Sequence, residues 1–329
     1  MNTNRNAQLV PVDEPRGGVD YSRVFGGAPD APLRAGLGVL LGLALYAVAV
    51  PLVAQLVVGI GWAIAGKPIG FAAYFKEAMA FLHPSGLVGA HLGLALLILV
   101  TLALTRWVNQ RRARWAVSVQ PGMRWRYLLL CLPIAAVVLN LVLLAGRGGR
   151  FPALDPQRDV WLWLSLVLLT APLQAAGEEF FFRGYLIQAL GGIGDGIKLT
   201  PEQTRWLAVV GSALVFALFH GVQNLPLFVD RFGFGLLAGA LVIWTGGLEA
   251  GIACHVANNL FAFGWAAFTG GIAQARALQA IGWSNAASDL LGFGLFALVA
   301  WWLARRMNLA TSTPGGSLRP DLAAGRTVG

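Results

Sequence analysis

The stretch VWLWLSLVLLTAPLQAAGEEFFFRGYLIQAL, Val160 to Leu190, decides the fold class of this chain. Its first 18 residues carry no charged side chain, and a helix of about 20 apolar residues can cross roughly 30 Å of hydrocarbon. Two adjacent carboxylates and an arginine then follow inside the same run. The segment therefore predicts a membrane-spanning helix with charged groups at a depth where they are costly.

The composition of the whole chain also indicates a membrane protein. Of its 329 residues, 57% are apolar and 12% are charged, and the mean hydropathy of +0.66 lies outside the range of soluble domains. Eight apolar segments have spanning length, approximately 34–64, 86–106, 127–146, 160–190, 205–222, 226–245, 248–268 and 286–304. The predicted fold is an all-α, polytopic integral membrane helix bundle of about eight transmembrane helices, embedded in a lipid bilayer.

The basic residues that give the net charge of +9 concentrate at the ends of the predicted spans, and their pattern is not that of a nucleic-acid site. Six arginines and no acidic residue lie in and beside the connection of the second and third spans: Arg106, Arg111, Arg112, Arg114, Arg124 and Arg126. The positive-inside rule places this connection in the cytoplasm. Counting outward from it puts both termini in the cytoplasm, and the expected location is a bacterial inner membrane.

Ionisable and amide side chains inside the predicted spans are the candidate functional residues. A charged group at the centre of a bilayer costs at least about 2.5 kcal/mol, so each one needs an explanation. The candidates are Glu178, Glu179 and Arg183 in the fourth span, His220 in the fifth, and His255 and Asn259 in the seventh.

Helical spacing divides the charges of the fourth span. Glu179 and Arg183 are four residues apart, so they share a face and can form an ion pair. Glu178 lies about 100° round the helix, which leaves it without a partner in its own segment. We therefore expect Glu179 and Arg183 to form a supporting pair that positions Glu178.

The other two spans repeat the four-residue spacing. His255 and Asn259 share one face, as do Phe216 and His220. A single intramembrane histidine is often only a polar contact between helices. However, Glu178, His220, His255 and Asn259 are chemically complementary groups on three spans, and this favours a functional site over packing.

These four groups could form a hydrolytic site without a serine, cysteine or aspartate nucleophile. Glu178 and His220 can flank one water and share the work of a general base. N–H groups of His255 and Asn259 can stabilise the oxyanion that forms when this water attacks a carbonyl.

A glutamate and two histidines could instead hold a zinc ion with an open position for water. The absence of an HExxH motif and the weak affinity of asparagine for zinc favour the version that needs no cofactor. The sequence assigns no metal ligands.

The three motifs resemble those of a known protease family. EEFFFR (Glu178 to Arg183), FALFH (Phe216 to His220) and HVANN (His255 to Asn259) are similar to the ordered motifs EExxxR, FxxxH and HxxxN. These motifs belong to the CAAX prenyl protease type II and bacteriocin-processing family, the CPBP or Abi family of intramembrane proteases. The resemblance covers about residues 160–265.

The resemblance implies a role for each matched residue. Glu178 and His220 would activate water, and His255 and Asn259 would form the oxyanion site. Glu179, Arg183 and Phe216 would be supporting residues. Eukaryotic members remove the C-terminal tripeptide of prenylated CAAX proteins, and the family is often described as metalloproteases.

The expected function is that of an intramembrane endopeptidase acting on a peptide or membrane-protein substrate, in CAAX-type or leader-peptide processing. One alternative is a proton-coupled transporter, in which the same groups would relay protons and repeated halves would be expected. Another is a noncatalytic membrane protein of bacteriocin immunity. The sequence assigns no oligomeric state.

The expected organisation of the chain has five parts. They are a mobile cytoplasmic N-terminal tail (1–33), N-terminal membrane spans (34–159), a CPBP-like catalytic helical core (160–268), a loop with the last span (269–306), and a disordered C-terminal tail (307–329).

Overall fold

The computed structural model describes residues 14–197 and 199–314, and the regular elements of these residues are all helices. The longer helices are α1 (Ala31–Ile64), α3 (Pro84–Ala103), α4 (Trp125–Gly146), α5 (Val160–Glu178), α7 (Pro201–Leu218), α8 (Leu225–Thr245), α9 (Glu249–Phe268) and α11 (Trp283–Arg306). The shorter helices are α2 (Phe71–Met79), α6 (Ile187–Gly196) and α10 (Ile272–Arg276). The 3-10 turns η1 (Tyr21–Arg23) and η3 (Ala113–Ala116) and the π-helical segments η2 (Leu104–Val108) and η4 (Glu179–Leu186) complete the set.

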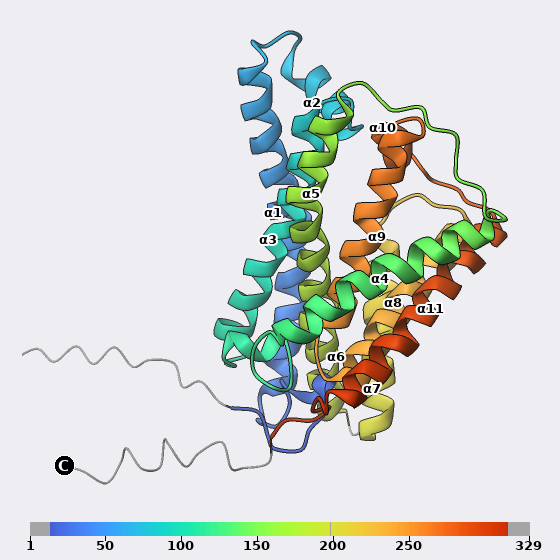
Figure 1. The fold of residues 1–329 in the computed structure, drawn as a ribbon. Helices are drawn as coiled ribbons and strands as arrows, with labels where there is room; N and C mark the ends of the chain where they lie inside the picture. The colour runs from blue at the N-terminus through green and yellow to red at the C-terminus, as the bar shows by residue number, and fades with distance from the viewer. Residues whose placement is uncertain (1–13, 198, 315–329) are drawn as a thin grey trace, which may run out of the picture.

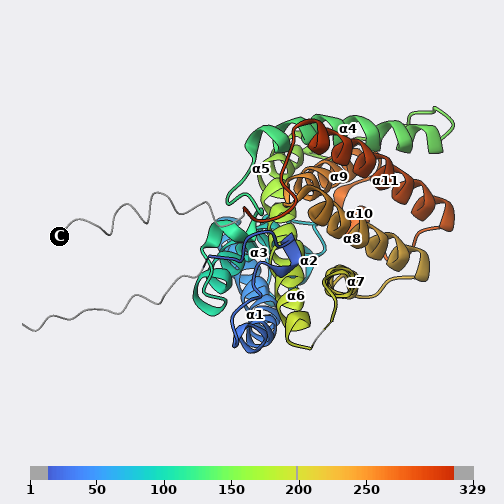
Figure 2. The same cartoon turned by 90° about the horizontal axis from the view of Figure 1, so that it is seen from below.

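The helices pack in a closed order around the bundle. Going round, the contacting neighbours are α1, α3, α5, α9, α4, α11, α8, α7 and α6, and α6 returns to α1. Figure 1 shows α4 and α11 running side by side and obliquely across α8 and α9. Figure 2, the view from below, shows α5 and α6 near the middle of the bundle.

The prediction of an all-α, polytopic membrane bundle is confirmed within the described residues. Six helical stretches are long and apolar enough to cross a membrane: Ala31–Ile64, Pro84–Val108, Trp125–Gly146, Val160–Gly196, Leu225–Thr245 and Trp283–Arg306. α7 and α9 form where the sequence predicts two further spans, but they are less apolar than these six. Polar residues explain the difference, since α7 begins with Glu202 and Arg205 and α9 contains Glu249 and the pair Asn258–Asn259.

Cap residues determine where the helices around the site begin and end. Thr200 and Gln203 form a capping box at the start of α7, with Pro201 in the first turn. Asn224 accepts a hydrogen bond from the Leu227 backbone N–H at the start of α8. α8 ends at Thr245 and is capped by Gly246, whose φ of 73° is left-handed and suits glycine.

The described parts of both predicted tails are packed against the bundle. Tyr21 is completely buried, and its hydroxyl donates a hydrogen bond to the carbonyl of Ala116. Arg23 forms a 2.9 Å ion pair with Asp195 at the end of α6. The polar composition of the predicted N-terminal tail gives no indication that an aromatic side chain such as Tyr21 is buried and anchors the segment to the bundle. The predicted tail residues 1–13 and 315–329 lie outside the described residues.

The two ends of the described chain meet at one end of the bundle. Backbone hydrogen bonds join Gly18 and Val19 to Thr313, whose side chain is also buried. Arg111, from the arginine-rich connection, donates to the carbonyls of Val24 and Gly26 at 3.0 and 2.9 Å. The arginine-rich connection and both described chain ends therefore lie at the same end of the bundle.

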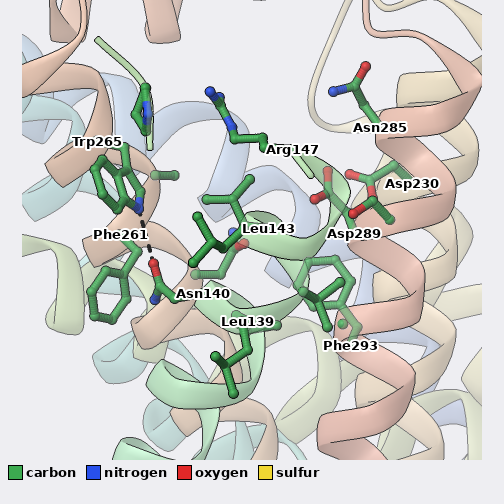
Figure 3. Close-up of a pocket in the computed structure, with 18 of the residues that line it drawn as sticks. Leu139, Asn140, Leu143, Arg147, Asp230, Phe261, Trp265, Asn285, Asp289 and Phe293 are labelled. Atoms are coloured by element: carbon green, nitrogen blue, oxygen red, sulfur yellow. Dashed lines mark hydrogen bonds between the residues drawn. The ribbon is translucent and has the colours of Figure 1, made fainter. Parts of the chain in front are cut away.

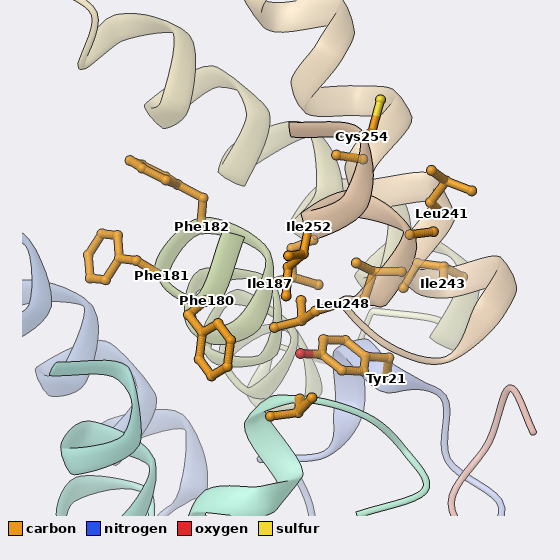
Figure 4. Close-up of a cluster of buried hydrophobic side chains, with 14 of the residues drawn as sticks. Tyr21, Phe180, Phe181, Phe182, Ile187, Leu241, Ile243, Leu248, Ile252 and Cys254 are labelled. Atoms are coloured by element: carbon orange, nitrogen blue, oxygen red, sulfur yellow. The ribbon is translucent and has the colours of Figure 1, made fainter. Parts of the chain in front are cut away.

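The main hydrophobic core surrounds η4 and the start of α6. Figure 4 shows Phe180, Phe181 and Phe182 projecting in different directions from this segment, with Leu248 and Tyr21 nearby. Close helix packing brings α5 to this core, because a Cβ on Gly177 would lie 2.2 Å from the carbonyl oxygen of Leu94 on α3. Every residue of η4 is buried, so the segment that carries the charged motif lies within this core.

Candidate active site

The two adjacent glutamates lie at the point where an α-helix becomes a π-helix. Glu178 is the last residue of α5 and Glu179 is the first residue of η4. Every residue of η4 is buried, and Glu178 is 6% exposed. π-helical turns occur frequently at functional sites, and this one places both carboxylates inside the bundle.

Glu178 contacts one side chain from its own helix and one from α9. Nε2 of Gln174 donates a 2.7 Å hydrogen bond to Oε2 of Glu178, and Nε2 of His255 lies 3.3 Å from the same oxygen. The prediction that Glu178 has no partner in its own segment was therefore wrong. Gln174 lies one turn earlier in α5, and its amide reaches the carboxylate along the helix face.

Glu179 links Arg183 to His255. Its Oε1 lies 3.0 Å from Nη1 of Arg183 and 2.9 Å from Nδ1 of His255. The guanidinium of Arg183 is completely buried and lies over the ring of Phe216, with Cζ 4.2 Å from the ring centroid. The predicted ion pair is therefore present, and the ring of Phe216 also covers the buried charge. The same carboxylate of Glu179 holds the imidazole of His255.

Asn259 joins the same group through Gln174. Its Nδ2 donates a 2.7 Å hydrogen bond to Oε1 of Gln174, and its Oδ1 accepts from Asn258 at 3.2 Å. The amide of Gln174 therefore bridges Glu178 on α5 and Asn259 on α9. Hydrogen bonds through Gln174 and the 3.3 Å contact of His255 with Glu178 therefore join three of the four predicted catalytic residues.

His220 lies at the edge of this group, in the turn that follows α7. Its Nδ1 contacts the carbonyl of Phe216 at 2.7 Å, and its ring lies 4.6 Å from the Phe216 ring centroid. The Phe216 ring is in turn 6.1 Å from that of His255. Among the described residues, His220 makes no hydrogen bond or ion pair with Glu178, His255 or Asn259, and an aromatic ring connects it to them.

The donors of the site do not gather around a metal position. Both ring nitrogens of His255 face carboxylate oxygens. Within residues 14–197 and 199–314, no group of three or more His, Cys, Asp or Glu side chains is arranged to hold a metal ion. The residues as placed do not fit a zinc site, and we derive no step that uses a metal.

Three residues of this region were missed by the sequence prediction. Gln174 could have been found, because it is an amide side chain four positions before Glu178 in a mostly apolar helix. Asn258 adjoins Asn259 and differs from it only in the face it occupies. Phe234, whose ring lies 5.1 Å from that of His255, carries no signal that separates it from other apolar residues of α8.

The comparisons with known proteins agree with the motifs. Residues 159–261 match the family model described as type II CAAX prenyl endopeptidase Rce1-like. This range includes all four predicted catalytic residues and supports the CPBP assignment. Together with the apolar helices, the match points to an integral membrane protein and supports a CAAX-type intramembrane protease in general.

One curated relative has no described function. The uncharacterized protein YyaK of Bacillus subtilis (strain 168) is 27% identical over 167 residues, which cover 47% of this chain and 53% of YyaK. The chain thus spans about half the length of this relative. No solved structure matches the chain.

Proposed function

We propose that the chain is an intramembrane endopeptidase that hydrolyses a peptide bond with water activated by Glu178 and His220. The observation that carries this proposal is the position of His255 between Glu178 and Glu179, at 3.3 and 2.9 Å. It puts a carboxylate base on α5 next to an imidazole donor on α9, inside a buried site. A base and an oxyanion donor at this separation can act on the same carbonyl group.

The first step is attack by water. Glu178 accepts a proton from the water while the water oxygen forms a bond to the carbonyl carbon, and the π electron pair moves to the carbonyl oxygen. His220 can donate from Nδ1 to the Phe216 carbonyl, which leaves Nε2 as an acceptor for the second water proton. The two side chains would then orient one water.

The developing oxyanion is stabilised by His255 and Asn259. Glu179 accepts a hydrogen bond from Nδ1 of His255, as the buried carboxylate does for the histidine of a catalytic triad. Nε2 of the same ring lies 3.3 Å from Oε2 of Glu178, and an N–H at this position can turn to the oxyanion once Glu178 has accepted the proton of the water. One N–H of Asn259 is used by Gln174, and the second remains for the same oxygen.

Collapse of the intermediate completes the reaction. The C–N bond breaks, the leaving amine takes the proton from Glu178, and the new carboxyl group is released. We propose that the substrate is a peptide or a membrane-protein segment, processed in CAAX-type or leader-peptide maturation. The arginine-rich connection supports a cytoplasmic position, in a bacterial inner membrane, for the end with both described chain ends.

A peptide library tests the proposal. Purified protein in lipid nanodiscs is incubated with apolar peptides, with and without a prenylated cysteine, and the products are identified by mass spectrometry. The proposal predicts cleavage at defined bonds by the wild type and none by Glu178→Ala. Cleavage by neither protein, with both folded, would favour the noncatalytic alternative.

A further inference from the structure

A large cavity lies between α4, α8, α9 and α11, toward the end of the bundle that carries residues 147–159 and 269–282 (Figure 3). Its volume is about 800 Å³, within the range of sites that enclose a ligand of several hundred daltons. Most of the wall is apolar, with Leu139, Leu143, Phe261, Trp265 and Phe293 as examples. An apolar chain therefore fits this cavity.

Two carboxylates interrupt the apolar wall. Asp230 of α8 and Asp289 of α11 lie side by side in Figure 3, where each projects from a different helix. Oδ1 of Asp230 is buried and has no hydrogen-bond partner. Within the described part of the chain, neither aspartate has an ion pair, and the lining residue Arg147 has none either. The two neighbouring carboxylates repel each other, and the Arg231 guanidinium, which interacts with Asp230 without forming an ion pair, offsets only one of the two negative charges.

The cavity adjoins the candidate active site. Asn258 lines the cavity and donates a hydrogen bond to Asn259. Phe293 also lines it, and its ring lies 4.9 Å from that of Phe234, which contacts His255. A molecule in the cavity is thus separated from the proposed oxyanion donors by a wall one or two side chains thick.

We infer that this cavity binds the apolar part of the substrate and that Asp230 and Asp289 receive a basic side chain from it. The inference rests on the proposed endopeptidase function and names its substrate class, an apolar peptide segment that contains lysine or arginine. Charge complementarity selects this occupant, because a lipid acyl chain would fill the apolar walls but bring no positive charge to the two carboxylates.

A binding assay tests the inference without requiring cleavage. Two fluorescent apolar peptides, identical except for lysine or uncharged norleucine at one position, are titrated against the full chain in nanodiscs. We expect the lysine peptide to bind at least about tenfold more tightly, as close charge pairs in interfaces do. Asp230→Asn with Asp289→Asn should remove this preference. Asp155→Asn, which removes an exposed carboxylate at the same end of the bundle, should keep it.

Equal affinity for the two peptides, or a lysine preference that survives in the double variant, would overturn the inference. If the two peptides bind equally and a neutral lipid displaces both to the same extent, the cavity is a lipid site, and this result would also overturn the inference. The proposed function is judged separately. A lysine preference without cleavage contradicts the endopeptidase, whereas cleavage without the preference contradicts only the cavity assignment.

Discussion

Gln174 donates a 2.7 Å hydrogen bond from Nε2 to Oε2 of Glu178, one turn later in the same helix. Because an ionised carboxylate can only accept, the other end of the amide faces Asn259, which donates to it at 2.7 Å. One side chain therefore orients both a proposed base and a proposed oxyanion donor.

Replacing Gln174 by leucine should lower kcat with little change in KM. A hydrogen bond to a charged group contributes about 1.5–3 kcal/mol, so we expect a loss of about tenfold to a hundredfold. The measurement is peptide cleavage under saturating and limiting substrate. Gln55→Leu, at an exposed position of α1, serves as the control, and an unchanged kcat in Gln174→Leu would remove the residue from the proposed mechanism.

Loss of Arg183 should be more harmful than loss of the whole Glu179–Arg183 pair. Arg183→Met leaves a buried carboxylate uncompensated and should lower the free energy of unfolding by about 3–5 kcal/mol. The double variant Glu179→Gln/Arg183→Met should recover part of this loss. Unfolding in detergent measures both, and strictly additive effects of the two single variants would show that the pair is not coupled.

Replacing Gly251 by alanine should displace the Glu179 carboxylate of the candidate site. An added Cβ would lie 2.9 Å from Oε2 of Glu179, so the carboxylate must move away from Nδ1 of His255. Gly251→Ala should therefore lower the cleavage rate by about tenfold or more, which corresponds to the loss of one charge-assisted hydrogen bond.

Gly264→Ala is the matched control for this prediction. It lies in the same helix, and an added Cβ meets nothing within 4 Å. Since alanine favours a helix over glycine by roughly 1 kcal/mol, this variant should be as active as the wild type and slightly more stable. Equal activity of the two alanine variants would contradict the crowding of Glu179.

Exhaustive chelation should leave cleavage intact. We propose metal-free catalysis because both nitrogens of His255 face carboxylates and not a shared metal position. Activity and zinc content are measured before and after chelation. Activity that is lost with the metal and restored by adding zinc would establish the zinc-dependent alternative.

The sequence was sufficient for the fold class and for the ion pair of the fourth predicted span, since apolar length and a spacing of four residues act locally. Glu179 and Arg183 pair as their spacing predicts. The six apolar stretches follow from composition alone. Local periodicity does not reveal which face of one helix meets another, so the contact between His255 and both glutamates needed the structure.

Other features depend on packing between distant segments. Tyr21 is buried against the Ala116 carbonyl although it lies in a polar stretch. The π-helical geometry of η4 does not follow from the residue types of EFFFRGYL. The cavity is lined by residues of α4, α8, α9 and α11, so it depends on how four helices meet, which no pattern within one helix predicts.

The most direct test of the account compares peptide cleavage by the wild type and by Glu178→Gln, two side chains of nearly the same shape. A glutamine cannot accept the proton of the attacking water, and general base catalysis contributes about a hundredfold to ten-thousandfold. We predict that Glu178→Gln loses at least about a hundredfold in kcat while its melting temperature stays close to that of the wild type. A folded Glu178→Gln protein that cleaves at the wild-type rate would contradict the central claim that Glu178 activates water.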